Sequence, residues 1–365
     1  MMAILLRAAV FALGLTLFAV TLTSAVKTFV LPRSATDGLA RAVFLVMRRA
    51  FDLRLRGATT YAQRDRIMAF YAPVSLLALL PTWLILVWIG YASMFWAVGV
   101  PSWYQAFRDS GSALLTLGFA PVEGVAQTLL AFSEATVGLI LIALLIAYLP
   151  TIYSAFQRRE AAVNLLEVRA GKPPSAVEMI ERFHRIHGLD RLDEQWQAWE
   201  AWFADIEESH TSLAALVFFR SPRPDHSWIT AAGAVLDAAA LSLSALDIPR
   251  TPEAALCVRA GFIALRRIAD VFGIAHNADP HYPEQPISVR RDEFDAVCDR
   301  LAVEGVPLMA DREQAWRDFA GWRVNYDTVL LALCSITMAP PAAWSSDRAP
   351  AFRSPAVFAK RPLTR

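Results

Sequence analysis

The sequence predicts an all-α membrane protein whose C-terminal half is a separate helical domain. Apolar residues make up 56% of the 365 residues and charged residues only 19%, whereas soluble domains carry about 25% charged residues. Three apolar stretches are long enough to cross a bilayer, since a spanning helix needs about 20 such residues. Beyond Arg159 the chain alternates helical patterns with proline breaks.

The three predicted spans cover about residues 5–27, 67–99 and 124–153. The first stretch is uncharged from Ala8 to Val26, and the second is uncharged from Ile67 to Phe107, which is too long for one helix. The third stretch contains a single charged residue, Glu134. Two prolines inside the second span, Pro73 and Pro81, are expected to shape the helix rather than to carry chemistry.

Basic residues predict the orientation. The segment 31–66 is a basic loop with eight arginines against three aspartates, and Arg158 and Arg159 follow the third span. Because short loops rich in arginine stay in the cytoplasm, we expect an external N-terminus, a first transmembrane helix within residues 1–30 and a cytoplasmic C-terminal half in the cell membrane. A cleaved signal peptide, ending near Ala25, is the alternative and would invert this topology. The eight arginines are Arg33, Arg41, Arg48, Arg49, Arg54, Arg56, Arg64 and Arg66.

The segment between the second and third spans does not resemble an ordinary external loop. Its charges, Arg108 and Asp109, stand at its start, and Ser112–Val122 is small and apolar. A helix from Trp103 to Leu115 would be about 20 Å long, at 1.5 Å per residue. We therefore predict a re-entrant helix that dips into the membrane without crossing it.

The predicted re-entrant helix is followed by Thr116-Leu117-Gly118-Phe119-Ala120, and here the chain resembles the potassium-channel pore family of the bacterial two-transmembrane type. That family has a Thr-Val-Gly-Tyr-Gly filter between a re-entrant pore helix and an inner helix. The resemblance covers residues 67–159 as outer helix, pore helix, filter and inner helix. It implies that backbone carbonyls of Thr116, Leu117, Gly118 and Phe119 replace the hydration shell of a cation.

Two departures from the family pattern affect the expected selectivity. Ala120 stands where the family has a second glycine, and a Cβ is costly where φ is positive. Pro121 stands where an acidic residue is usual, so the outer mouth loses a charge. The resemblance therefore implies passive transport of potassium or of monovalent cations with weak selectivity. Since one loop cannot encircle an ion, we expect a homotetramer in the lipid bilayer.

Three further residues are candidates for the pore and inner helix: Ser112, Glu134 and Gly138. Glu134 is either a hydrogen-bond partner or cavity charge behind or below the filter, or a carboxylate at the outer end of the helix, because ionisable residues inside spans usually face protein or water. Gly138 marks either close helix packing or a gate, and packing is the commoner case.

Residues 175–340 are predicted to form a helical cytoplasmic domain, followed by a disordered tail over 341–365. Tryptophans 196, 199 and 202 recur with Phe203 at helical spacing and indicate a core face. Trp228–Leu246 is predicted as a buried core helix, with a membrane span as the alternative. Further helices are expected at 252–272, 291–304 and 311–338.

Several functions find no support in the sequence. Cys257, Cys298 and Cys334 are too few and too widely spaced for a disulfide framework or a zinc site, and a formal charge of +1 leaves no nucleic-acid footprint. No metalloprotease helix or glycine-rich phosphate loop is present, so neither enzyme activity, nor a cofactor, nor a metal beyond the permeant ion is predicted. A non-conducting scaffold or sensor with a channel-like architecture remains an alternative, as does an enzyme within residues 175–340.

Overall fold

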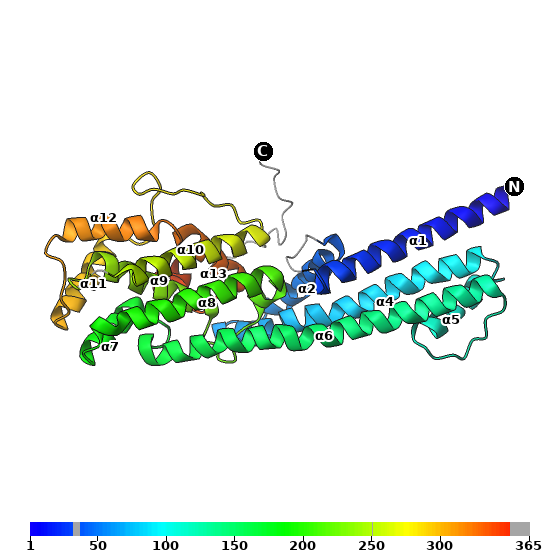
Figure 1. The fold of residues 1–365 in the computed structure, drawn as a ribbon, viewed down its shortest axis with the longest axis horizontal. Coiled ribbons are helices and arrows are strands. Elements are labelled where there is room, and N and C mark those ends of the chain that lie inside the picture. The colour runs from blue at the N-terminus through cyan, green and yellow to red at the C-terminus, as the bar shows by residue number, and fades with distance from the viewer. Residues whose placement is uncertain (32–36, 250, 351–365) are drawn as a thin grey trace. The chain divides into compact units, whose positions relative to one another are not determined.

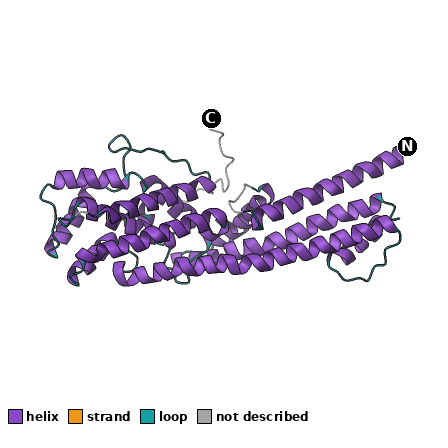
Figure 2. Cartoon of the chain, viewed as in Figure 1, coloured by secondary structure: helices purple, strands orange, loops and turns teal. Residues whose placement is uncertain are grey.

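A computed structural model describes residues 1–31, 37–249 and 251–350. These residues are almost all helical or in turns, and none of them forms a strand; an isolated antiparallel bridge between Leu246 and Leu308 is the nearest approach to one (Figures 1 and 2). The chain divides into two compact units. The first comprises residues 1–56 and 70–153, and the second comprises residues 57–69 and the chain from Ser154 onward.

The first unit is built around three long apolar helices. They are α1 (Met2–Phe29), α4 (Tyr71–Ala97) and the first part of α6 (Val125–Ala170). Each is long and apolar enough to cross a membrane, which agrees with the three predicted spans. For the described residues, the prediction of an all-helical chain with three helices able to span a membrane is therefore confirmed. Pro73 and Pro81 both lie within α4, which continues past them to Ala97.

Helices α1 and α4 pack antiparallel through small residues. A Cβ added to Gly14 or to Gly90 would overlap the carbonyl oxygen of the other, so the two backbones are in close contact there. Ten residues further along α1, the Ser24 hydroxyl accepts a 3.0 Å hydrogen bond from Trp83 Nε1. Such close approaches are how helices associate when lipid removes the hydrophobic drive between them.

Helix α6 runs alongside the other two and antiparallel to α4. The Tyr91 hydroxyl of α4 donates to Ser133 Oγ at 3.1 Å, near the start of α6. Towards the other end of the unit, the rings of Phe29 and Tyr148 lie 4.6 Å apart. Helices α1 and α6 therefore point the same way and α4 points the opposite way, as three successive crossings require (Figure 1).

The predicted basic loop at 31–66 contains two helices. Helix α2 (Gly38–Leu55) belongs to the first unit, and its N-cap Asp37 accepts hydrogen bonds from the Ala40 amide and the Ser24 hydroxyl. Helix α3 (Tyr61–Met68) starts with a capping box between Thr60 and Gln63 and belongs to the second unit. The seven arginines from Arg41 to Arg66 therefore lie in or next to these two helices, and Arg33 lies outside the described residues.

The second unit is a helical domain with its own core. Its helices after α6 are α7 (Ala176–Arg185), α8 (Leu192–Ser212), α9 (Trp228–Ser244), α10 (Pro252–Val271), α11 (Arg291–Val303), α12 (Arg312–Arg323) and α13 (Asp327–Thr337), with short 3₁₀ turns at Leu189–Arg191, Ala214–Phe218 and Ser346–Arg348. Almost every residue of α9 is buried, as expected for a core helix. The tryptophan face of α8 and all three cysteines are buried too.

Two predictions about this domain need correction or limits. The expected helix over 311–338 is two helices, because Arg323 turns into the core at the break and donates hydrogen bonds to the carboxylates of Asp237 and Asp327. Residues 341–350, the start of the predicted disordered tail, are packed: Trp344 is buried and its carbonyl accepts from Arg323. Residues 351–365 of that tail lie outside the described residues.

Candidate functional site

The candidate site is the short helix α5 (Trp103–Leu114) and the turn that follows it, between α4 and α6. Ser102 caps the helix by accepting a 3.1 Å hydrogen bond from the Gln105 amide. One side of α5 packs on Trp88 of α4, whose ring stacks on Phe107 at 4.0 Å and whose Nε1 donates to the Phe107 carbonyl at 2.9 Å. Gly111 makes this possible, because a Cβ there would overlap the Trp88 ring.

Ser112 holds the predicted filter segment against the end of α5. Its carbonyl accepts hydrogen bonds from the amides of Leu117 at 2.9 Å and Gly118 at 3.5 Å. Its hydroxyl accepts a 3.2 Å hydrogen bond from the Ala120 amide. One buried serine therefore holds the turn at three residues, Leu117, Gly118 and Ala120.

The backbone of this turn is left-handed at two alternate positions. Thr116 has φ of +53° and Gly118 has φ of +68°. A positive φ is rare for a β-branched residue such as threonine, so the surrounding hydrogen bonds must hold it there. Ala120 has a negative φ, so its Cβ causes no backbone strain. The departure from glycine at Ala120 is thus tolerated by a different backbone conformation.

The side chains of the turn face away from the rest of the unit. Leu117 and Phe119 are 60% and 55% exposed. The guanidinium of Arg108 lies over the Phe119 ring at 5.7 Å. Within one chain, therefore, the Phe119 ring lies beside Arg108 and is not packed behind the turn. In a single subunit, therefore, the apolar side chains and the backbone of residues 116–119 are exposed.

Glu134 lies directly behind α5. It is fully buried, and its Oε1 accepts a 2.6 Å hydrogen bond from the Ser110 hydroxyl. The same hydroxyl lies 3.1 Å from the Trp88 carbonyl of α4. The other carboxyl oxygen, Oε2, has no hydrogen-bond partner among the described residues. Glu134 is therefore a buried hydrogen-bond partner of α5, and its relation to an ion filter stays a prediction.

Gly138 lies one helical turn further along α6, against the end of α5. A Cβ at this position would overlap the carbonyl oxygen of Leu114 and crowd its side chain. Because Leu114 is the last residue of α5, the glycine sets how closely α6 approaches the turn. This is the packing role weighed for Gly138.

Helix α6 also carries an apolar stripe that the unit does not cover. Phe132, Leu139, Ile146 and Tyr153 recur every seven residues, and each is more than half exposed. A seven-residue repeat returns to nearly the same side of a helix. The stripe and the exposed turn belong to the same unit and both need apolar surroundings.

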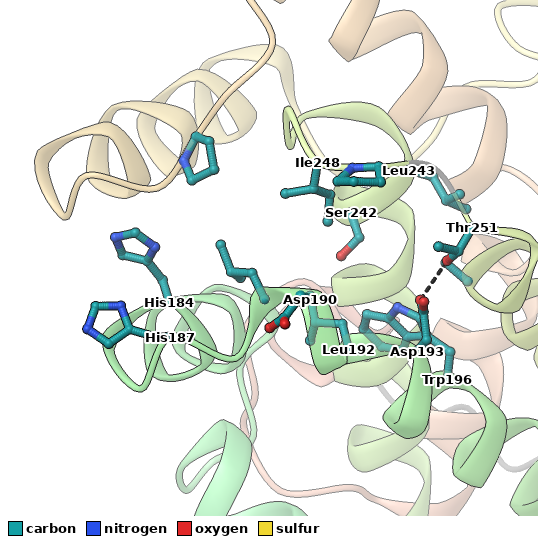
Figure 3. A pocket seen from close by; sticks show the side chains of 14 residues that line it. His184, His187, Asp190, Leu192, Asp193, Trp196, Ser242, Leu243, Ile248 and Thr251 are labelled. Atoms are coloured by element: carbon teal, nitrogen blue, oxygen red, sulfur yellow. Dashed lines mark hydrogen bonds between the residues drawn. The ribbon is translucent and has the colours of Figure 1, made fainter.

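The second unit contains a separate cavity of about 440 Å³. Figure 3 shows His184 and His187 at one end of it and Asp193 with Trp196 at the other, with Asp190 between them. Thr251 Oγ1 donates to Asp193 Oδ1 at 2.6 Å. No cluster of three side chains that could hold a metal occurs in the described parts of the chain. The cavity has the mixed polar and apolar walls of a ligand pocket and no activated nucleophile.

A buried charge lies where α6 enters the second unit. Arg159 is fully buried and donates to the carbonyls of Leu216 at 2.9 Å and Phe219 at 2.8 Å. His210 Nε2 lies 3.3 Å from Arg159 Nη1. Since arginine can only donate, Nε2 must accept and the ring is neutral. Burial, with Arg159 beside it, holds the pKa of His210 well below its usual range.

Sequence reasoning missed two members of the site, Ser110 and Trp88. Both are ordinary residues by type, and only the packing of α5 between α4 and α6 gives them a role. No protein-family model, curated protein or solved structure matches the chain, so the candidate site rests on the geometry of this chain alone.

Proposed function

We propose that the protein is a subunit of a pore-loop cation channel. The observation that carries the proposal is the turn at Thr116–Ala120, held by three hydrogen bonds to Ser112 and left uncovered within one chain. Backbone carbonyls can replace the hydration shell of an ion when several such turns face one axis. Thr116 and Gly118 have left-handed backbone conformations, and we expect such conformations in a turn that directs its carbonyls towards one axis.

Four copies around one axis form the assembly we propose. Each chain supplies one turn, and a closed ring of identical turns requires rotational symmetry. The uncovered apolar stripe on α6, from Phe132 to Tyr153, supports association, since neighbouring chains or lipid must cover it. In this assembly α5 is the re-entrant pore helix and α6 is the inner helix.

The second unit is built from two separate segments of the chain, and this supports the proposed topology. Its residues 57–69 precede α4, and its residues from Ser154 onward follow the apolar part of α6. Arg220 forms an ion pair with Asp65 and donates to the Tyr61 hydroxyl, so both segments share one folded body. A membrane cannot separate them, and the arginine content of 33–66 favours the cytoplasmic side.

Monovalent cations with a weak preference for potassium are the proposed substrates. Ala120 lacks the freedom of glycine, and its amide is committed to Ser112. With fewer backbone carbonyls at fixed positions, the pore discriminates less between ions that differ in size and hydration.

Ion flux into liposomes containing the purified protein tests the proposal, with potassium and sodium compared. Gly118→Val should abolish flux, because valine cannot adopt φ of +68° without strain. Ala120→Gly should raise the potassium-to-sodium ratio. Gly57→Val is the matched control, since its site has open space around it and no positive φ. Flux that survives Gly118→Val would show that this segment is not the filter.

A non-conducting membrane scaffold or sensor is the second candidate function. It is favoured by Phe119, which lies exposed under Arg108 instead of behind the turn. A stable tetramer with no flux for any monovalent cation would support this candidate over the channel.

A further inference from the structure

Helix α2 presents one surface on which arginines and apolar side chains alternate. We call this surface, formed by Val46, Arg49, Leu53, Arg54 and Arg56, the arginine face. All five residues are exposed, and Val46 and Leu53 are 62% and 60% exposed. Residues 46, 49, 53 and 56 are spaced three or four apart, which places them on one side of a helix.

The opposite side of α2 is anchored at the end of a span. The rings of Phe44 and Phe51 pack edge-on against Tyr71, the first residue of α4, at 6.2 and 5.8 Å. The Tyr71 hydroxyl donates to the Phe44 carbonyl at 3.3 Å. The Arg48 guanidinium lies 5.6 Å from the same ring centroid. Phe44 and Phe51, two helical turns apart on α2, thus both contact Tyr71. These contacts fix α2 beside the first turn of α4.

The charges of α2 are unbalanced. Arg48 is buried and paired with Asp52 at 2.9 Å. Arg49, Arg54 and Arg56 have no carboxylate partner among the described residues. An exposed guanidinium binds phosphate oxygens well, because its planar fork of donors matches their geometry. Apolar side chains between the arginines favour a lipid surface over water or a purely ionic ligand.

We propose that the arginine face binds the headgroups of anionic phospholipids at the cytoplasmic surface of the membrane. The position of α2 beside the start of a membrane-crossing helix puts the guanidiniums at headgroup depth, with Val46 and Leu53 directed at the acyl boundary. Clusters of basic residues next to a span bind anionic lipids in this way. The proposal depends on the protein being embedded in a membrane and is independent of ion conduction.

Lipid retention by the purified full-length protein tests the proposal. The delipidated protein in detergent is titrated with phosphatidylglycerol or with phosphatidylcholine of the same acyl chains, and bound lipid is counted by native mass spectrometry. We expect phosphatidylglycerol to bind more tightly than phosphatidylcholine. An arginine near an anionic surface contributes about fivefold in affinity, so the triple change Arg49→Gln, Arg54→Gln and Arg56→Gln should lower phosphatidylglycerol binding roughly a hundredfold.

Two controls separate lipid binding from other effects. The triple change of the same arginines to lysine keeps the charge and should retain most of the binding. The triple change Arg191→Gln, Arg290→Gln and Arg317→Gln removes exposed arginines of the second unit and should leave lipid binding unchanged. An unchanged thermal midpoint shows that each variant is folded.

Three results would overturn the proposal. The first is equal affinity for the two lipids, and the second is unchanged binding after the triple glutamine change. The third is displacement of the lipid by millimolar inorganic phosphate or by an acidic peptide, which would identify a free anion or a protein as the ligand.

Discussion

Ser110 of α5 donates a 2.6 Å hydrogen bond to Glu134 of α6, and this bond joins the two helices inside a fully buried contact. The bond matters because the carboxylate has one oxygen with no partner in the described structure, so Ser110 is its main source of polar compensation. The pair therefore fixes both the depth and the rotation of α5 against α6.

Ser110→Ala should destabilise the protein by about 1–3 kcal/mol, because it leaves the Glu134 carboxyl buried without its donor. Thermal unfolding in detergent measures the loss. A cycle with Glu134→Gln should give a coupling of about 0.5–3 kcal/mol, as for residues in direct contact. Thr136→Ala is the control, since its exposed hydroxyl donates only to its own helix. Additive effects of the two changes would show that the bond contributes nothing.

Gly138→Ala should displace α5 and lower cation flux, because the new Cβ would overlap the Leu114 carbonyl. Overpacking of this kind costs about 1–3 kcal/mol. Gly321→Ala in α12 is matched in chemistry but has open space around it, and it should be neutral or stabilising. Comparison of flux and thermal midpoint for the two variants checks this prediction. Equal behaviour would mean that α6 is free to move away from α5.

Fusions of a reporter enzyme that is active only in the cytoplasm should be active after Arg66 and after Arg159. The reason is the ion pair between Asp65 and Arg220, which joins the chain before α4 to the chain after α6. A fusion after Pro101, between α4 and α5, should be inactive. Activity at only one of the first two positions contradicts the topology.

Acid should destabilise the second unit through His210. The pKa of His210 is lowered in the folded chain, so the unfolded chain binds more protons and stability falls as the pH drops below about 6.5. Burial and the positive charge of Arg159 disfavour a charged imidazole, and they outweigh the Ile206 carbonyl and the Trp228 ring, which favour it. The contribution to the slope is at most about 1.4 kcal/mol per pH unit.

Thermal midpoints of the full chain between pH 7.5 and 5 measure this dependence. His210→Gln should give a flatter profile, at the expense of lower stability at neutral pH. His281→Gln changes a mostly exposed imidazole and should leave the profile as it is. A wild-type profile as flat as that of His210→Gln would refute the assignment.

The long apolar helices and the short helix between them were predictable because hydropathy and length act locally. The predicted helix from Trp103 to Leu115 differs by one residue from α5. The partner of Glu134 was not predictable. Ser110 and Ser112 are two residues apart and so point to opposite sides of a helix, and only packing decides that Ser110 meets Glu134 while Ser112 holds the turn.

The break near Arg323 was missed for a similar reason. Apolar periodicity continues through residues 311–338, but the buried charges of Asp237 and Asp327 draw Arg323 inward and the chain turns there. Asp237 lies far away in sequence, on α9, so no local pattern records this attraction. Helix α2 was missed as well. The arginines of residues 31–66 were used to predict a cytoplasmic loop, and the helical spacing within that segment was not considered.

The anchoring of Tyr61 and Asp65 by Arg220 has a consequence for biosynthesis. The ribosome makes residues 57–69 before α4 and α6, yet their binding site, which includes the carbonyls of Thr337 and Met338 beside Arg220, emerges near the end of translation. In the proposed topology the second unit can fold completely only after both intervening helices have crossed the membrane, because a single crossing would leave its two segments on opposite sides. In the proposed topology its folding is therefore a late step, and a chain in which only one of α4 and α6 crossed the membrane would leave α3 on the side opposite to Arg220 and exposed to proteases.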